Sequence, residues 1–258
     1  MEIAEHIDTL ERNGDALAQA TGKTGLDADV PPCPGWTVAD LIRHTGYVHR
    51  WAARNVAEQP PKVIGGDTEE DILGGGPSDE ELLDWFRDGY AALAETLRKT
   101  DPAAPAPVFL PNTTSPLGFW ARRQAHETAI HRADAELAAG QPPAYDKSFA
   151  ADGLDELIMG FAARGRRIPE GIRGRSILVR SADTENAWRL AWSADPGTRG
   201  TCERLSLADD ITADCVLSGP AEGLYLTLWN RSDASAAGVT ITGATDVAAA
   251  WRDFKVCW

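Results

Sequence analysis

Along the first 145 residues, apolar side chains recur at intervals of three and four positions in stretches near 2–21, 37–56, 79–99 and 116–140. This spacing follows the period of the α-helix and predicts four amphipathic helices, each with one buried face. Helix start signals accompany three of them, as capping boxes or as an N-cap before proline: Thr37/Asp40, Ser78/Glu81 and Ser115-Pro116. The pattern therefore predicts a four-helix bundle, a scaffold whose interior commonly holds metal ligands from facing helices.

After about residue 145 the pattern changes, and Pro142-Pro143 marks the shift. We expect a further helix over 149–164, and then shorter runs typical of half-buried strands at 176–180, 187–192, 213–217 and 239–242. Two more helices are predicted, from Pro220 to about Trp229 and from a capping Thr245 to Phe254. The chain is thus predicted to be an α+β protein of two domains, a helical bundle over 1–145 and a small domain with an antiparallel sheet over 146–258.

Two of the predicted helices carry polar residues on the stripe that should face inward. Successive turns of the last bundle helix place these residues on one face: Leu117, Trp120, Gln124, Glu127, His131 and Ala135. Glu127 and His131 are four residues apart, so they differ by about 40° around the helix and can share a ligand. In the second helix, His44 falls on the stripe of Leu41, Val48 and Trp51.

Buried carboxylates and imidazoles are costly unless they are paired or bind a metal. For either helix alone, a hydrogen-bonded core residue is the favoured interpretation. Taken together, His44, Glu127 and His131 favour a metal site with an open coordination position. His126 does not extend this set into a metalloprotease motif, because it lies five residues before His131 and diverges from it by about 140°.

Composition limits the partners and the compartment. The 258 residues carry a net charge of −14, which argues against nucleic acid and anionic membrane surfaces. The four cysteines are scattered without a CxxC pair, as expected of reduced thiols in a cytoplasmic protein. The amino terminus lacks the design of a signal peptide, and no apolar run approaches the roughly 20 residues that span a bilayer.

Two sequence stretches carry a family resemblance. The stretch Val30-Pro-Pro-Cys-Pro-Gly-Trp-Thr-Val-Ala-Asp-Leu-Ile-Arg-His44 and the stretch His126-Glu-Thr-Ala-Ile-His-Arg-Ala-Asp134 resemble actinobacterial proteins related to mycothiol-dependent maleylpyruvate isomerase. The resemblance implies a DinB-like metal-binding bundle, followed by an α/β sandwich that resembles a sterol-carrier-protein domain. More weakly, residues 218–243 are similar to the second domain of that family.

The resemblance implies a divalent metal, usually zinc, held by His44, Glu127 and His131, with mycothiol as the thiol cosubstrate. It also implies that Arg231 contributes to catalysis and helps bind the thiol or the substrate. The alternative for Arg231 is an arginine that offsets a helix dipole. Asn230 departs from the glycine that many relatives carry before this arginine, which puts the local geometry of Arg231 in question.

A metal with an open position would deprotonate a thiol that enters it. Such a thiolate could transfer to an electrophile, or add to an activated double bond and leave after rotation, giving cis–trans isomerisation. We therefore expect a mycothiol-dependent S-transferase or isomerase, acting on small molecules as a monomer or homodimer. The alternative is a non-catalytic module, stabilised by metal, that binds a small ligand or a partner in stress responses.

Residues near these stretches have less specific interpretations. Asp134 could accept a hydrogen bond from a ligand histidine, but solvent exposure is the favoured interpretation. Trp36 is interpreted as a packing residue and Cys33 as a buried one. His6 and His49 are expected at the surface.

Overall fold

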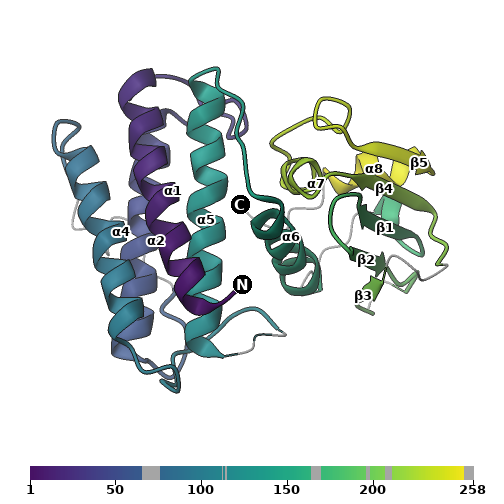
Figure 1. Ribbon diagram of the computed structural model, residues 1–258, viewed down its shortest axis with the longest axis horizontal. Coiled ribbons are helices and arrows are strands. Elements are labelled where there is room, and N and C mark those ends of the chain that lie inside the picture. The colour runs from purple at the N-terminus through teal and green to yellow at the C-terminus, as the bar shows by residue number, and fades with distance from the viewer. Residues whose placement is uncertain are drawn as a thin grey trace. The chain divides into compact units, whose positions relative to one another are not determined.

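The computed structural model describes residues 1–65, 76–111, 113, 115–163, 170–195, 198–206 and 211–252. The chain divides into two compact units. The first comprises Met1–Phe109 with Thr113–Pro143, and the second comprises Leu110–Asn112 with Ala144–Trp258. It is a mixed α+β fold with a helical amino-terminal part and a carboxy-terminal sheet, as the sequence predicts (Figure 1).

The described part of the first unit is a bundle of four α-helices (Figure 1). Their bounds are α1 (Ile3–Thr24), α2 (Val38–Glu58), α4 (Leu82–Lys99) and α5 (Pro116–Ala138). Helix α1 packs against α4 and α5, and α2 packs against the same two helices. The helices predicted from the hydrophobic period are confirmed, with ends that differ from the predicted ones by up to three residues.

The helix starts follow the predicted caps in two cases. Thr37 Oγ1 accepts from the Asp40 amide at 3.3 Å, and Asp40 accepts from the Thr37 amide at 2.9 Å. The Thr37 amide, and the Thr37 hydroxyl at 2.8 Å, donate to the Asp40 carboxylate and lower its pKa. The interpretation of Asp40 as a capping residue is confirmed. Ser115 Oγ accepts from the Gly118 amide at 3.0 Å, directly before the proline that opens α5.

The third capping signal differs from the prediction. Ser78 Oγ donates to Glu81 at 2.8 Å, but α4 begins only at Leu82. The Ser78–Glu81 contacts therefore close the turn that precedes the helix rather than cap the helix itself.

Helix α5 is buried on more than one face. Its buried residues include apolar ones such as Trp120 and Ala129, and also Arg123, His126 and Asp134. Every residue of α5 is buried or half-buried, so its polar residues have limited access to water. The polar side chains of α5 that are fully buried must therefore find partners inside the protein.

The second unit begins with helix α6 (Lys147–Asp155), which continues directly into a π-helical segment η1 (Glu156–Ala162). The predicted single helix over 149–164 corresponds to these two segments, and residue 164 lies outside the described residues. A short 3-10 helix η2 (Glu170–Ile172) leads into the sheet. Helices α7 (Ala221–Leu228) and α8 (Thr245–Trp251) follow later and pack on the central strands.

The described strands form one mixed sheet in the order β3-β2-β1-β4-β5. They are β1 (Ser176–Ser181), β2 (Asn186–Ala191), β3 (Thr201–Ser206), β4 (Cys215–Gly219) and β5 (Thr240–Gly243). The prediction of a wholly antiparallel sheet is wrong at the centre, where β1 pairs with β4 in parallel and Leu178 lies opposite Val216. The hairpin of β2 and β3 occupies one edge of β1. Strand β4 therefore pairs with the opposite edge of β1.

Two further details of the second unit differ from the sequence prediction. Strand β3 was not predicted, because its residues are exposed or half-buried and lack an apolar alternation. Thr245 is the first residue of α8, not its cap, because the N-cap position is Ala244. The predicted end of this helix at Phe254 lies outside the described residues.

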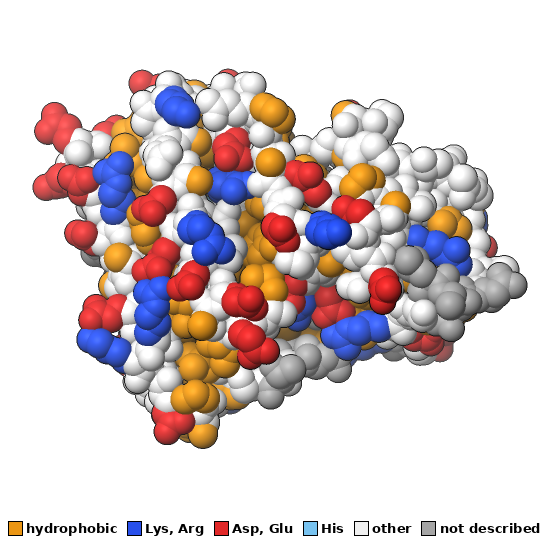
Figure 2. Space-filling model, viewed as in Figure 1, with side chains coloured by type: hydrophobic (Ala, Val, Ile, Leu, Met, Phe, Trp, Pro, Cys, Tyr) orange, Lys and Arg blue, Asp and Glu red, His pale blue; other side chains and the backbone are white. Residues whose placement is uncertain are grey.

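The surface reflects the charge composition. On the face shown in Figure 2, acidic and basic side chains are interspersed over the helices of the first unit. None of the helices in the described ranges is long and apolar enough to cross a membrane.

Candidate metal centre

Three candidate ligands from two helices converge inside the first unit. His44 lies on α2, and Glu127 and His131 lie one turn apart on α5. Glu127 Oε1 is 3.2 Å from His131 Nε2 and 3.8 Å from His44 Nε2. One donor atom from each of the three residues lies within 4.8 Å of the others. The structure thus brings together the residues that the helical spacing had suggested.

The distances between the donor atoms fit a zinc ion. Ligand nitrogens and oxygens lie roughly 2.0–2.2 Å from zinc, so tetrahedral neighbours are separated by about 3.3–3.6 Å. The observed 3.2 Å and 3.8 Å bracket this range and need only small side-chain adjustments. Two imidazoles and one carboxylate form a catalytic type of zinc set, which leaves a position for water or substrate.

The centre is accessible on one side and enclosed on the other. The side chains of His44 and Glu127 are 22% and 23% exposed, whereas that of His131 is 9% exposed. The imidazole of His44 meets that of His131 edge to face, with ring centroids 5.3 Å apart. His44 and Glu127 therefore keep more contact with solvent than His131 does.

The charge of Glu127 is stabilised from within its own helix. Burial alone would raise the pKa of this carboxyl, but hydrogen bonds from His131 and His44 and the positive charge of Arg123 hold it well below its usual value. Arg123, four residues earlier, is itself buried and places Nη2 2.9 Å from Glu127 Oε2. Glu127 is thus an anion with one oxygen facing the arginine and the other facing the two histidines.

His131 is held between two carboxylates. Its Nδ1 lies 2.9 Å from Oδ2 of Asp134, while its Nε2 faces Glu127. Burial alone would lower the pKa of His131, but these two carboxylates raise it in the protein without metal. The interpretation of Asp134 as solvent-exposed is wrong, because this residue is fully buried and contacts His131.

A turn over residues 30–36 supports both histidines. Backbone hydrogen bonds from Val30 to Trp36 and from Trp36 to Cys33 close this turn just before α2. The Trp36 ring lies 5.0 Å from that of His44, and Trp36 also packs on the core, as predicted. Cys33 is half-buried rather than fully buried, and its Sγ lies 3.6 Å from Asp134 Oδ2.

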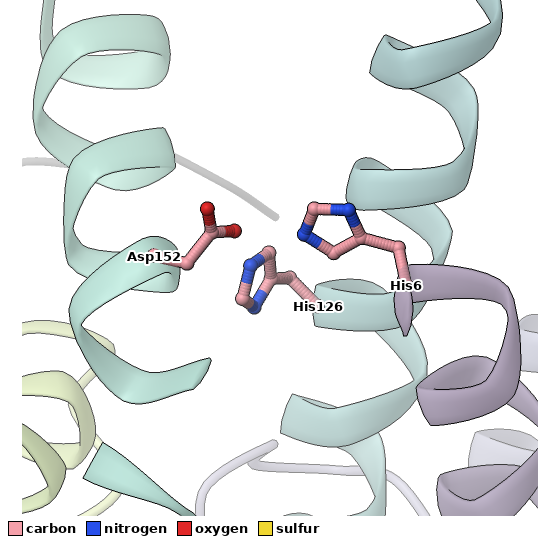
Figure 3. Close-up of side chains that lie close together, drawn as sticks. All are labelled: His6, His126 and Asp152. Carbon is pink, nitrogen blue, oxygen red and sulfur yellow. The ribbon is translucent and has the colours of Figure 1, made fainter. Parts of the chain in front are cut away.

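The expected surface positions of two histidines are wrong. His6 is 4% exposed and His49 is fully buried. Figure 3 shows His6 projecting from α1 and His126 from α5, with ring centroids 6.1 Å apart. As the five-residue spacing predicts, His126 is not part of the donor group formed by His44, Glu127 and His131.

His49 is a neutral imidazole next to the charged centre. Its Nε2 lies 2.8 Å from Thr128 Oγ1, and its ring packs at 5.5 Å from that of Phe86. Burial lowers the pKa of His49 from 6.5 to about 3. The folded protein therefore holds His49 without a proton at a pH where the unfolded chain protonates it.

This difference makes the folded state less stable in acid. The contribution of His49 to the free energy of unfolding is nearly constant above pH 6.5. It declines as the pH falls from 6.5 toward 3, because in that range only the unfolded state takes up the proton. At pH 5 the free energy of unfolding should be lower by about 2 kcal/mol than at pH 7 from this group alone. A His49→Gln variant should lack this component. Denaturant unfolding of parent and variant at both pH values, in the presence of chelator, measures it; parallel pH curves would contradict the assignment.

The predicted Arg231 lies in the second unit, directly after α7. Asn230 adopts a left-handed conformation with φ of 61°, which asparagine tolerates better than most residues. The Arg231 amide donates to Leu226 O at 2.8 Å, and its guanidinium donates to Trp229 O at 2.8 Å. Asparagine therefore provides the positive φ for which glycine is the usual residue, and Arg231 follows a closed helix end.

Sequence reasoning missed Arg123 and undervalued Asp134. Both were accessible from spacing alone, since Arg123 precedes Glu127 by four residues and Asp134 follows His131 by three. These intervals place side chains on one helix face. The burial that makes both contacts significant was not visible in the sequence.

The fold and the donor set define a protein with a candidate metal centre in a helical bundle, joined to an α+β unit. The sequence matches the mycothiol maleylpyruvate isomerase N-terminal domain over residues 7–136 and the C-terminal domain of the same family over residues 148–250. The chain belongs to this family.

Solved structures with the same fold include a mycothiol-dependent maleylpyruvate isomerase, with a TM-score of 0.62 and 15% identity over 94% of this chain and 93% of that chain. A histidine-to-alanine mutant of such an enzyme gives a TM-score of 0.60 and 14% identity over the same shares. No curated protein matches the sequence.

Proposed function

We propose that this protein is a metal-dependent enzyme that activates mycothiol, either for cis–trans isomerisation of a maleylpyruvate-like acid or for S-transfer to another electrophile. The observation that carries the proposal is the convergence of His44, Glu127 and His131 from two facing helices. Membership of the mycothiol maleylpyruvate isomerase family supports the choice of thiol and of reaction.

The proposed metal is zinc, held by His44, Glu127 and His131. When bound there, it would lower the pKa of a coordinating thiol so that the thiolate is present at neutral pH. The chain's own residues prepare the site: hydrogen bonds from His131 and His44, with the charge of Arg123, hold the pKa of Glu127 low. Trp36 packs beside the His44 ring. The partial exposure of His44 and Glu127 leaves an approach for a small molecule.

The thiol and the substrate are the only reactants in the proposed isomerisation. The sulfur adds to one carbon of the activated cis double bond, and the electron pair of that bond moves onto the adjoining carbonyl group. Rotation about the resulting single bond and expulsion of the same sulfur restore the double bond in the trans form. No net oxidation occurs and the thiol is regenerated, whereas in S-transfer the sulfur stays on the electrophile.

We further propose that Arg231 binds a carboxylate of the substrate or of the thiol. A guanidinium presents paired N–H donors that match a carboxylate, and the closed helix end before Arg231 fixes its backbone. The proposed location is the cytoplasm, where cysteines stay reduced. Cys33, Cys202 and Cys215 are free thiols.

The test begins with the parent protein purified without a chelator or a histidine tag. Near-stoichiometric zinc, measured by plasma mass spectrometry, together with mycothiol-dependent conversion of maleylpyruvate or consumption of mycothiol with a panel of electrophiles, would support the proposal. A metal-loaded protein that leaves mycothiol and every electrophile unchanged would contradict it. The small-ligand-binding module would then be the better account.

A further inference from the structure

The ligand histidine of α5 is contacted at both of its ring nitrogens. Nε2 of His131 faces the donor group at 3.2 Å from Glu127 Oε1, and Nδ1 faces away from it at 2.9 Å from Asp134 Oδ2. Asp134 follows His131 by three residues on the same helix. The helix therefore places the carboxylate behind the imidazole without a contribution from any loop.

Asp134 is fully removed from solvent. A buried carboxylate is costly unless its oxygens accept hydrogen bonds. Oδ2 of Asp134 meets Nδ1 of His131, and the same oxygen lies 3.6 Å from the thiol of Cys33 in the 30–36 turn. The carboxylate is thus fixed from two sides, by α5 and by the turn that precedes α2.

The chemistry of imidazole gives this contact a specific consequence. A neutral histidine carries one N–H, and only the other nitrogen has the lone pair that binds a metal. An ionised carboxylate accepts hydrogen bonds and donates none. In the protein without metal, Glu127 at Nε2 and Asp134 at Nδ1 can each accept an imidazole N–H. With a metal held at Nε2, Asp134 would keep the remaining proton on Nδ1.

We infer that Asp134 is a positioning residue, which selects the Nδ1–H form of His131 and fixes the orientation of its ring for metal binding through Nε2. The inference rests on the proposed metal centre. It adds a residue that is not one of the three proposed metal ligands but contacts one of them, His131. Carboxylates behind metal-bound histidines typically contribute 10–100-fold to metal affinity. Asp134 should have an effect of this size.

A purely structural role makes a different prediction. Asp134 also connects α5 to the 30–36 turn through Cys33, so its loss could weaken the fold without altering His131. Metal affinity and the stability of the metal-free protein separate the two roles. A structural role lowers the melting temperature of the metal-free protein alone, whereas a positioning role lowers the affinity for metal.

The experiment compares Asp134→Asn with a carboxylate-to-amide change elsewhere on α5. Asparagine keeps the shape of Asp134 and removes its charge. Glu136→Gln is the control, because Glu136 is a half-buried carboxylate on the same helix, pairs with Arg132 at 3.3 Å and contributes no donor atom to the centre. Zinc dissociation constants are measured by competition with a chromogenic chelator, with melting temperatures of the metal-free forms.

The expected result is a dissociation constant 10–100-fold higher in Asp134→Asn and unchanged in Glu136→Gln. A parent-like constant in Asp134→Asn overturns the inference and leaves the proposed function intact. A parent protein that binds no zinc overturns the proposed function, and the inference with it. The two failures are therefore distinguishable.

A measurement on the parent protein keeps the test independent of the variant's folding. With zinc added, nitrogen-15 spectra of histidine-labelled protein should show a His131 proton on Nδ1 that exchanges slowly with water. His131→Gln assigns the signal by its loss. A proton on Nε2, or rapid exchange at Nδ1, would overturn the inference.

Discussion

Replacing His44 or His131 with alanine is expected to lower zinc affinity by more than about a hundredfold, because residues that only orient metal ligands already contribute 10–100-fold. Each substitution removes one of three donors that lie within 4.8 Å of one another. Mycothiol-dependent turnover should fall in parallel if the proposed function is right. Metal content of the purified variants and their activity with added zinc check both parts.

The control must separate loss of a ligand from loss of a buried histidine. His49 serves this purpose, since it is fully buried on the same helix as His44 and contributes no donor atom. His49→Gln should keep near-stoichiometric zinc, while His44→Ala loses it. Full zinc content in His44→Ala would show that the metal binds elsewhere.

Replacing Arg123 with methionine should destabilise the metal-free protein by about 3 kcal/mol, which is the lower end of the cost of breaking a buried ion pair. Arg123 is 2% exposed, and its loss leaves the Glu127 carboxylate without its nearest full positive charge. We expect the lower end of this cost because 23% of the Glu127 side chain is exposed to solvent. Denaturant unfolding in chelator measures the change.

A bound metal ion should reduce this penalty, because its charge replaces that of Arg123 at Glu127. The loss measured with saturating zinc should therefore be smaller than the loss in chelator. Arg132→Met is the matched control. Arg132 pairs with Glu136 at the same four-residue spacing on α5, but Glu136 is not a candidate metal ligand. Equal losses with and without metal would show that Arg123 acts through packing alone.

The candidate ligands could be predicted from the sequence because helical geometry links position to direction. Glu127 and His131 share a face of α5 whatever surrounds that helix. His44 falls on an inward stripe of α2 for the same reason. That the two stripes meet follows from the bundle, in which α2 packs against α5.

The environment of these ligands could not be predicted in the same way. Asp134 and His49 were placed at the surface because polar residues are usually exposed. Both are fully buried, since α5 is surrounded on most sides and α2 packs between α4 and α5. Burial is the largest cause of the pKa of about 3 for His49.

In the second unit, local signals predicted elements but not their pairing. The sequence predicted strands β1, β2, β4 and β5. It did not predict β3, because the exposed residues of β3 show no apolar alternation. The parallel pairing of β1 with β4 joins segments nearly forty residues apart, and no local pattern specifies it.

The sequence by itself determined the four bundle helices, the caps of α2 and α5, and the shared face of Glu127 and His131, because each depends on residues within one or two turns of one another. The tertiary structure decided which of these residues lose contact with water. It brought His44 within 3.8 Å of Glu127, and it closed the 30–36 turn so that Cys33 reaches Asp134. Burial and contact between distant segments depend on how whole helices pack, and a local pattern does not contain that information.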